Sequence, residues 1–143
     1  MTPEEILSYP PKILTQEQRE HYFEFGFVGI KDLVPFETLK LIKKVTSEFV
    51  EKSREVTESN NVFDIGPGHS YENPVLRRLK SPDENHEEYW NFSKGLMADV
   101  ASDLVGPNVT FHHSKLNFKW YDESDNVKSV SYTHLTLPTR RFV

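Results

Sequence analysis

The sequence contains no cysteine, no long apolar run and no surplus of positive charge. The lack of cysteine excludes disulfides, thiolate nucleophiles and cysteine-ligated zinc sites. No stretch approaches the roughly 20 apolar residues of a membrane-spanning helix, and the N-terminal MTPEEILSYPPK has acidic residues where a signal peptide has basic ones. The net charge of −5 is opposite to the basic surplus of nucleic-acid-binding domains. These absences predict a cytoplasmic protein with neither a membrane nor a nucleic acid as partner.

The chain of 143 residues is long enough for one domain with a sizeable core. Apolar residues make up 36% of the sequence and aromatic residues 13%, so Phe, Tyr and Trp must supply much of that core. Residues 1–14 carry three prolines and are expected to form an N-terminal arm.

Local signals predict three helices. Thr15-Gln16-Glu17-Gln18 is a capping box, which predicts a helix through Phe25 that Gly26 ends. Apolar residues recur at three- and four-residue spacing over residues 36–49, which predicts a second helix. A third helix is expected over residues 87–104, before Gly106-Pro107.

Short strands are expected over residues 27–30 and 75–79, where β-forming side chains are bounded by turn or breaker residues. Two places stay open for the cations Arg77, Arg78 and Lys80: the mouth of a ligand pocket, or a solvated surface, which is favoured. Helices and strands together predict the α+β fold class.

The segment NVTFHHSKLNFKWY, which ends at Tyr121, predicts a long strand whose side chains alternate between two faces. One face ends in Leu116, Phe118 and Trp120, large apolar groups that need a packing partner. Two interpretations of the other face stay open: it points to water, or it lines a polar pocket that holds an anionic ligand. That face presents His113, Lys115, Asn117 and Lys119.

Common catalytic motifs are missing from the sequence. GPGHS has neither the length nor the Lys of a phosphate-binding loop, and no G-x-S-x-G nucleophile elbow is present. Only His86-Glu87-Glu88 has the His-x-carboxylate spacing of a non-haem iron site. It lies at an expected helix start, where side chains two residues apart point about 200° from each other. Spacing alone therefore predicts no complete metal site.

Two stretches resemble the phytanoyl-CoA dioxygenase family of iron(II)/2-oxoglutarate-dependent oxygenases: LTQEQREHYFEFGFVGIKDLVP, and NPVLRRLKSP with VGPNVTFHHSKLNFKW. The resemblance covers residues 15–128. It implies N-terminal helices followed by the first strands of a double-stranded β-helix, a jelly-roll or cupin-like core. Through the pattern His-x-Ser-x-Leu-x-x-Lys it implies that Lys119 binds 2-oxoglutarate, that Asn117 supports this cosubstrate, and that His113 approaches the substrate. It also favours the pocket interpretation, because an ammonium group suits a dicarboxylate.

The resemblance stops after YDESDNVK. The family's next motif, Trp-His-x-Asp, supplies two iron ligands, but SVSYTHL follows here. In His134-Leu135-Thr136 a threonine stands where the aspartate is needed, and the family's later core strands, second histidine and cosubstrate-binding arginine do not follow. The resemblance thus implies Fe(II) and 2-oxoglutarate as cofactors of a full-length protein, with the iron site missing from this chain.

The final residues, 129–143, differ in amino-acid composition from the charged and aromatic segment before them. Read back to DNA, VSYTHLTLPT is GTC TCT TAT ACA CAT CTG ACG CTG CCG ACG, which looks like the transposase-end adapter of sequencing libraries. We therefore expect a non-native tail from Ser129 and a native sequence that ends at Lys128. Re-sequencing of the source locus tests this expectation.

The function expected on these grounds is that of an iron(II)/2-oxoglutarate-dependent dioxygenase that hydroxylates a small organic substrate. A truncated chain without the iron triad is expected to be inactive. The alternative is a non-catalytic binding domain that holds an anionic metabolite through Lys115 and Lys119.

Overall fold

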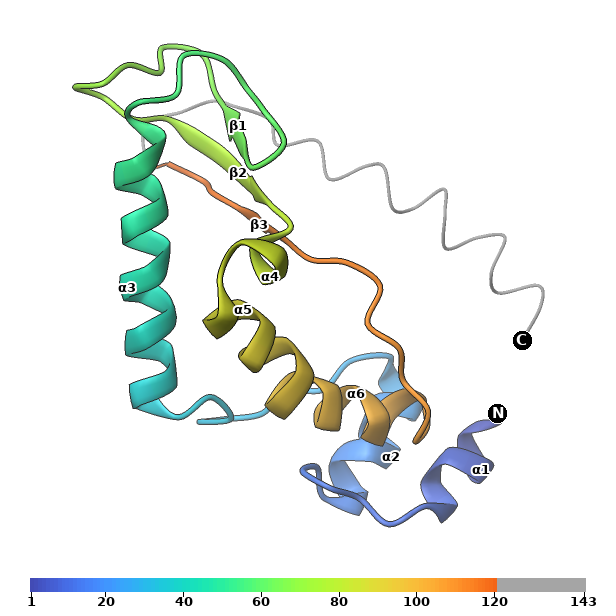
Figure 1. Cartoon of the computed structure of the whole chain (residues 1–143). Coiled ribbons are helices and arrows are strands. Elements are labelled where there is room, and N and C mark those ends of the chain that lie inside the picture. Colours follow the sequence, from blue (N-terminus) through green and yellow to red (C-terminus); the bar gives the residue numbers. More distant parts are fainter. Residues whose placement is uncertain (121–143) are drawn as a thin grey trace. The chain divides into compact units, whose positions relative to one another are not determined.

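The computed structural model of the chain describes residues 1–120. Helices are combined with a three-stranded antiparallel sheet of strand order β1-β2-β3, as predicted for the α+β class (Figure 1). A jelly-roll core stays a prediction. The expected non-native tail from Ser129, with His134, lies outside the described residues. The described residues divide into two compact units: Met1–Phe49 with Ser81–Ser114, and Val50–Lys80 with residues 115–120.

The first unit is helical. Its helices α2 and α6 both contact α1, and α4 contacts α5. None of the helices in the described part of the chain is long and apolar enough to cross a membrane. The elements of the unit are α1 (Pro3–Ser8), α2 (Gln16–Phe25), most of α3 (Phe36–Ser53), α4 (Pro82–Asn85), α5 (Glu87–Phe92), the π-helical segment η1 (Ser93–Met97) and α6 (Ala98–Val105).

The predicted ends of α2 are confirmed. The Thr15 side chain accepts a hydrogen bond from the backbone N–H of Gln18, whose own side chain accepts from the Thr15 N–H. Gly26 ends the helix with φ of 81°, in the left-handed region that glycine adopts without strain. Thr2 and Glu5 form a second capping box of the same kind, which starts α1 inside the expected N-terminal arm.

A buried carboxylate, Asp103 on α6, joins the N-terminal arm to the rest of the first unit. Its side chain is only 3% exposed. It accepts hydrogen bonds from the backbone N–H groups of Lys12, Ile13 and Leu14, each at 2.8 Å. Burial acts to raise the pKa of Asp103, but these three bonds and the charge of Arg19 lower it to below its usual value of 3.8.

Arg19 on α2 completes this network and is 1% exposed. Its Nε donates to the backbone oxygen of Asp103 at 2.9 Å. Its Nη1 and Nη2 donate to the backbone oxygens of Tyr9 at 3.0 Å and Ile6 at 2.5 Å. We call these two side chains and the backbone groups that they bind the Arg19–Asp103 network. It satisfies the buried charges and fixes residues 6–14 in place.

The predicted helix over residues 87–104 is confirmed, with an interruption. Its middle, η1, is π-helical, and Gly95 within it has non-helical angles of φ −91° and ψ −111°. The Tyr89 hydroxyl on α5 lies 2.7 Å from the Thr46 hydroxyl on α3. Thr46 also donates to the backbone oxygen of Ile42, so Tyr89 is the donor in the bond to Thr46. This bond ties α5 to α3.

The second unit is built on the sheet of β1 (Phe63–Ile65), β2 (Leu76–Lys80) and β3 (Lys115–Asn117). Asp64 pairs with Arg78, but Ile65 pairs with Leu76, so Arg77 is an extra residue that bulges from β2. The bulge explains why Leu76 and Leu79, three residues apart, are both fully buried.

Two predicted strands need correction. Residues 27–30 form no strand, because no described segment pairs with them, and β-forming side chains alone do not make a ladder. The long strand expected over residues 109–120 is reduced to Lys115–Asn117, the part that lies opposite Arg78–Lys80 of β2. Residues 107–114 have no regular secondary structure and belong to the first unit.

Candidate functional site

The three-stranded sheet of the second unit has one face that carries mostly cations. Residues directly opposite each other on neighbouring strands project to the same side. Asp64, Arg78 and Asn117 form one such row, and Lys80 and Lys115 form the next. We call the side that presents these five residues the basic face: Asp64, Arg78, Lys80, Lys115 and Asn117.

The opposite side of the sheet is apolar and holds the strands together. Leu79 lies between Arg78 and Lys80 in the sequence, faces away from them and is fully buried. Its partners across the sheet are Phe63 and Leu116. Burial of this apolar side fixes the register and therefore determines which charged side chains share the basic face.

The side chains of Phe118 and Trp120 extend this apolar side beyond β3. The Trp120 Nε1 donates to the backbone oxygen of Leu76 at 2.8 Å, and the rings of Phe118 and Trp120 stack at 6.0 Å. The Phe118 N–H donates to the Arg77 oxygen at 2.9 Å, so pairing with β2 continues one residue past β3.

Two hydrogen bonds orient the cations of the basic face. The Arg78 Nε donates to the Asn117 Oδ1 at 3.0 Å. This bond fixes the plane of the guanidinium, which carries further N–H donors, and turns the Asn117 amide NH2 away from Arg78. The Lys80 Nζ donates to the backbone oxygen of Asn60 at 2.7 Å.

Lys80 and Lys115 lie directly opposite each other across β2 and β3. Like charges at such a position destabilise a sheet. Three cations share this face with the single carboxylate of Asp64, although the chain as a whole carries a net charge of −5. The basic face thus gathers positive charge on one side of the sheet, and such a local surplus attracts anions.

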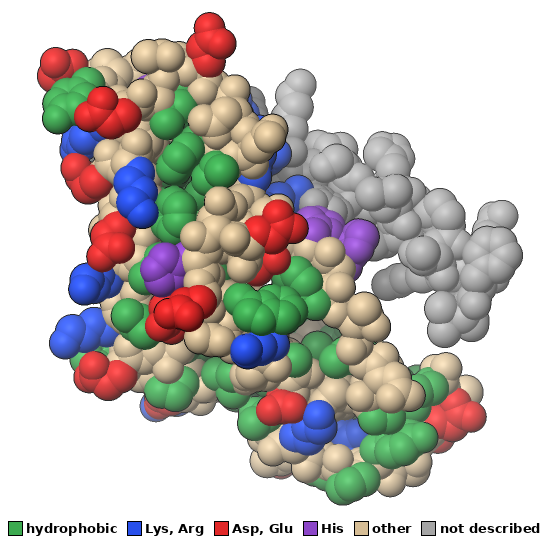
Figure 2. Space-filling model, viewed as in Figure 1, with side chains coloured by type: hydrophobic (Ala, Val, Ile, Leu, Met, Phe, Trp, Pro, Cys, Tyr) green, Lys and Arg blue, Asp and Glu red, His purple; other side chains and the backbone are tan. Residues whose placement is uncertain are grey.

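The surface of α3 offers a contrast. Figure 2 shows Lys and Arg side chains interleaved with Asp and Glu along the left edge of the view, where α3 lies. Opposite charges three or four residues apart on a helix pair with each other and keep the helix solvated. The lysines of α3 are therefore explained as a water-facing helix surface.

The structure places the three predicted site residues as follows. Asn117 is exposed on the basic face and bonded to Arg78. Lys119 is exposed two residues beyond β3, and strand alternation puts it on the side of Asn117. His113 belongs to the first unit, is exposed, and lies with its ring 4.5 Å from that of His112.

Arg78 and Lys80, for which a solvated surface was favoured over the mouth of a pocket, share the basic face with Asn117 and Lys115. The alternation of Arg78 and Lys80 around Leu79 is the sequence signal that could have found them. It was obscured because the bulge at Arg77 interrupts the period of two.

The described residues do not fit an iron site. No three side chains of His, Asp or Glu within residues 1–120 come together as a ligand group. His86, which has the His-x-Glu spacing, caps α5 instead, because its Nδ1 accepts a hydrogen bond from the Glu88 N–H at 3.2 Å.

Comparison with protein-family models, with curated proteins and with solved structures finds nothing that matches this chain. Function is therefore inferred from the basic face and from the sequence pattern around Lys119.

Proposed function

We propose that the basic face binds a small dicarboxylate, 2-oxoglutarate, and that the chain is part of an iron(II)/2-oxoglutarate-dependent dioxygenase with a jelly-roll core. The observation that carries the proposal is the pairing of Lys80 with Lys115 next to the pairing of Arg78 with Asn117. The family resemblance supplies the reaction class, and the basic face supports the choice of cosubstrate.

The two rows of the basic face suit the two ends of a dicarboxylate. Residues of one strand on the same face are about 7 Å apart, since each residue adds about 3.3 Å. One carboxylate would accept hydrogen bonds from the ammonium groups of Lys80 and Lys115, which lie opposite each other on paired strands. The other would accept hydrogen bonds from the Arg78 guanidinium and the Asn117 amide NH2.

Lys119 is assigned to the same ligand. By strand alternation it follows Asn117 on the same side, so its ammonium group extends the cationic row. His113 stays a proposed substrate residue on the strength of the resemblance alone. Turnover would require iron ligands other than the described residues.

The proposal is tested by isothermal titration calorimetry with 2-oxoglutarate in the absence of metal. We expect saturable binding that Arg78→Gln and Lys119→Gln each weaken about tenfold, the effect of one charge-assisted bond of about 1.4 kcal/mol. Lys44→Gln on α3 is the matched control, because it removes one positive charge from a helix surface. Absence of binding, or equal weakening by all three substitutions, contradicts the proposal.

A non-catalytic anion-binding domain is the second candidate. It is favoured by the coexistence of a basic face with no iron-ligand group within residues 1–120. Succinate release in the presence of iron(II), oxygen and 2-oxoglutarate separates the two. Turnover by this chain would exclude the binding domain, whereas binding without turnover is what it predicts.

A further inference from the structure

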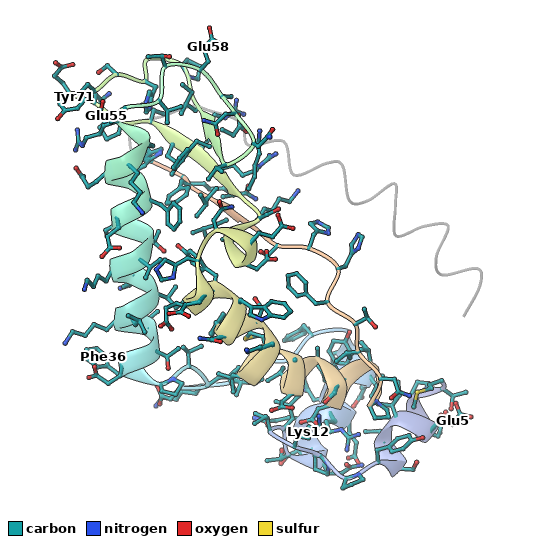
Figure 3. All side chains as sticks on the ribbon, viewed as in Figure 1. Glu5, Lys12, Phe36, Glu55, Glu58 and Tyr71 are labelled. Carbon is teal, nitrogen blue, oxygen red and sulfur yellow. The ribbon has the colours of Figure 1, made fainter. Side chains whose placement is uncertain are left out.

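The first unit contains an apolar cavity of about 500 Å³. It lies between the α5–η1–α6 helix and the extended segment 109–112, which runs back along that helix (Figure 1). Figure 3 shows side chains projecting from both into the space between them. The apolar walls are formed by Trp90, Met97, Ala98, Ala101, Val109 and Phe111.

Small residues keep this cavity open. Ala98 and Ala101 lie three residues apart on α6, on one side of the helix, and both line the cavity. Two large aromatic side chains border it: the rings of Trp90 and Phe111 meet edge to face at 5.4 Å. They stay 38% and 41% exposed, although burial of such rings is strongly favourable. A ring-shaped ligand in the cavity would cover them.

The polar groups of the cavity are positive or neutral. The Lys94 Nζ lies 5.9 Å from the centre of the Trp90 ring, and Ser93, Thr110 and His112 also line the cavity. No Asp or Glu is among its lining residues. The cavity therefore combines an apolar body with a cationic edge, which is complementary to an apolar anion.

We propose that this cavity binds a small aromatic monocarboxylate. The ring lies against Trp90, Met97 and Phe111, and the carboxylate pairs with the Lys94 ammonium group. The cavity would not retain 2-oxoglutarate, which has no apolar body to fill it. The proposal is thus independent of the basic face, which lies in the other unit.

Tryptophan fluorescence tests the proposal directly. The chain has two tryptophans, so Trp120→Phe leaves Trp90 as the sole reporter. The probe is phenylpropanoate, with the neutral phenylpropanol as its matched control. In the Trp120→Phe variant of the whole 143-residue chain we expect a saturable change in Trp90 fluorescence. The carboxylate should bind about fivefold more tightly than the alcohol, the effect of one partly exposed ion pair.

Two variants locate the site. Ala98→Leu fills the cavity with a good helix former and should abolish binding of both probes while far-ultraviolet circular dichroism stays unchanged. Lys94→Gln should leave binding of the alcohol intact and remove the fivefold preference for the carboxylate.

Each opposite result overturns the proposal: no saturable change, undiminished binding by folded Ala98→Leu, or a preference that survives Lys94→Gln. Calorimetric titration of the unsubstituted protein with the same two probes shows whether the Trp120→Phe substitution itself changes their binding. Ala98→Leu should also leave the binding of 2-oxoglutarate unchanged, which keeps failure here distinct from failure of the proposed function.

Discussion

The Arg19–Asp103 network and the basic face both gather charged side chains, but the two regions differ in every electrostatic respect. In the network the charges have opposite signs, are buried, and bond to backbone groups. On the basic face the charges mostly have one sign and lie half-buried. The comparison teaches that buried charge with complete hydrogen bonding stabilises a fold, whereas aligned charge of one sign creates a local field that attracts anions.

The energetic consequences differ accordingly. A hydrogen bond to a charged group contributes roughly 1.5–3 kcal/mol to stability, so the network stabilises the N-terminal arm strongly. The opposition of Lys80 and Lys115 costs a fraction of that, on the order of 0.2–1 kcal/mol. Substitutions should therefore act mainly on stability in the first region and mainly on binding in the second.

The largest effect is expected for Asp103→Ala, which leaves three backbone N–H groups and Arg19 without their carboxylate. We expect a loss of about 3–5 kcal/mol in the free energy of unfolding, measured by urea denaturation. The matched control is Asp99→Ala on the same helix. Asp99 forms an exposed ion pair with Lys12 at 3.0 Å, and its loss should cost about 1 kcal/mol or less. Lys12 is labelled in Figure 3. Equal losses in the free energy of unfolding for both variants would contradict the claim that the buried carboxylate stabilises the fold more than the exposed one.

Acid should weaken the same network. Because the pKa of Asp103 is lower in the folded chain than in the unfolded chain, the unfolded chain binds the proton first. The stabilisation is complete above the usual value of 3.8 and is lost as the pH falls through the lowered folded value. We expect the urea midpoint to fall as the pH drops below the usual value of 3.8, and Asp103→Asn to flatten this fall. The effect should be smaller than that of Asp103→Ala, because a protonated carboxyl keeps an acceptor oxygen. An identical pH profile for Asp103→Asn would contradict this assignment.

A smaller effect is expected for the neutral pair of the first unit, Thr46 and Tyr89. Burial raises the pKa of Tyr89, so its hydroxyl stays protonated and donates to Thr46. Thr46→Val and Tyr89→Phe should each cost about 1 kcal/mol, and the double variant should cost less than the sum of the two. Unfolding free energies of the four proteins form the test. Strict additivity would show that the two hydroxyls contribute independently.

The smallest change in stability, with an opposite sign, is expected for Lys115→Glu. It converts the like pair with Lys80 into an opposite-charge pair and should stabilise the chain by about 0.5 kcal/mol. It should also abolish binding of 2-oxoglutarate. Lys115→Gln is the control, with about half the gain in stability. If Lys115→Glu is stabilised but still binds 2-oxoglutarate, Lys115 is not part of the binding site, and the proposal is contradicted at this residue.

Local chemistry made part of the fold predictable. The capping box at Thr15 and the left-handed Gly26 depend only on neighbouring residues, so the sequence predicts α2 closely. The same signal at Thr2 and Glu5 starts α1 within residues 1–14, for which an arm was predicted from the three prolines. The three-residue length of β3 was not predictable, since a strand extends only as far as its partner pairs with it.

The candidate site was predictable only in part. Alternation along the chain placed Lys115 and Asn117 on one face, which the register with β2 confirms. The contribution of Arg78 and Lys80 depends on the bulge at Arg77 and on pairing between segments far apart in the sequence. The interior of the Arg19–Asp103 network was equally hidden, because it joins residues 84 positions apart.

The central claim, that the basic face is a ligand site and the Arg19–Asp103 network is not, is tested most directly by nuclear magnetic resonance. Backbone amide shifts are followed in the full chain as 2-oxoglutarate is added without metal. The account predicts that the amides of Lys80, Lys115 and Asn117 shift along one saturating curve while those of Arg19 and Asp103 stay fixed. Shifts confined to the network, or none on β2 and β3 at saturating 2-oxoglutarate, would contradict it.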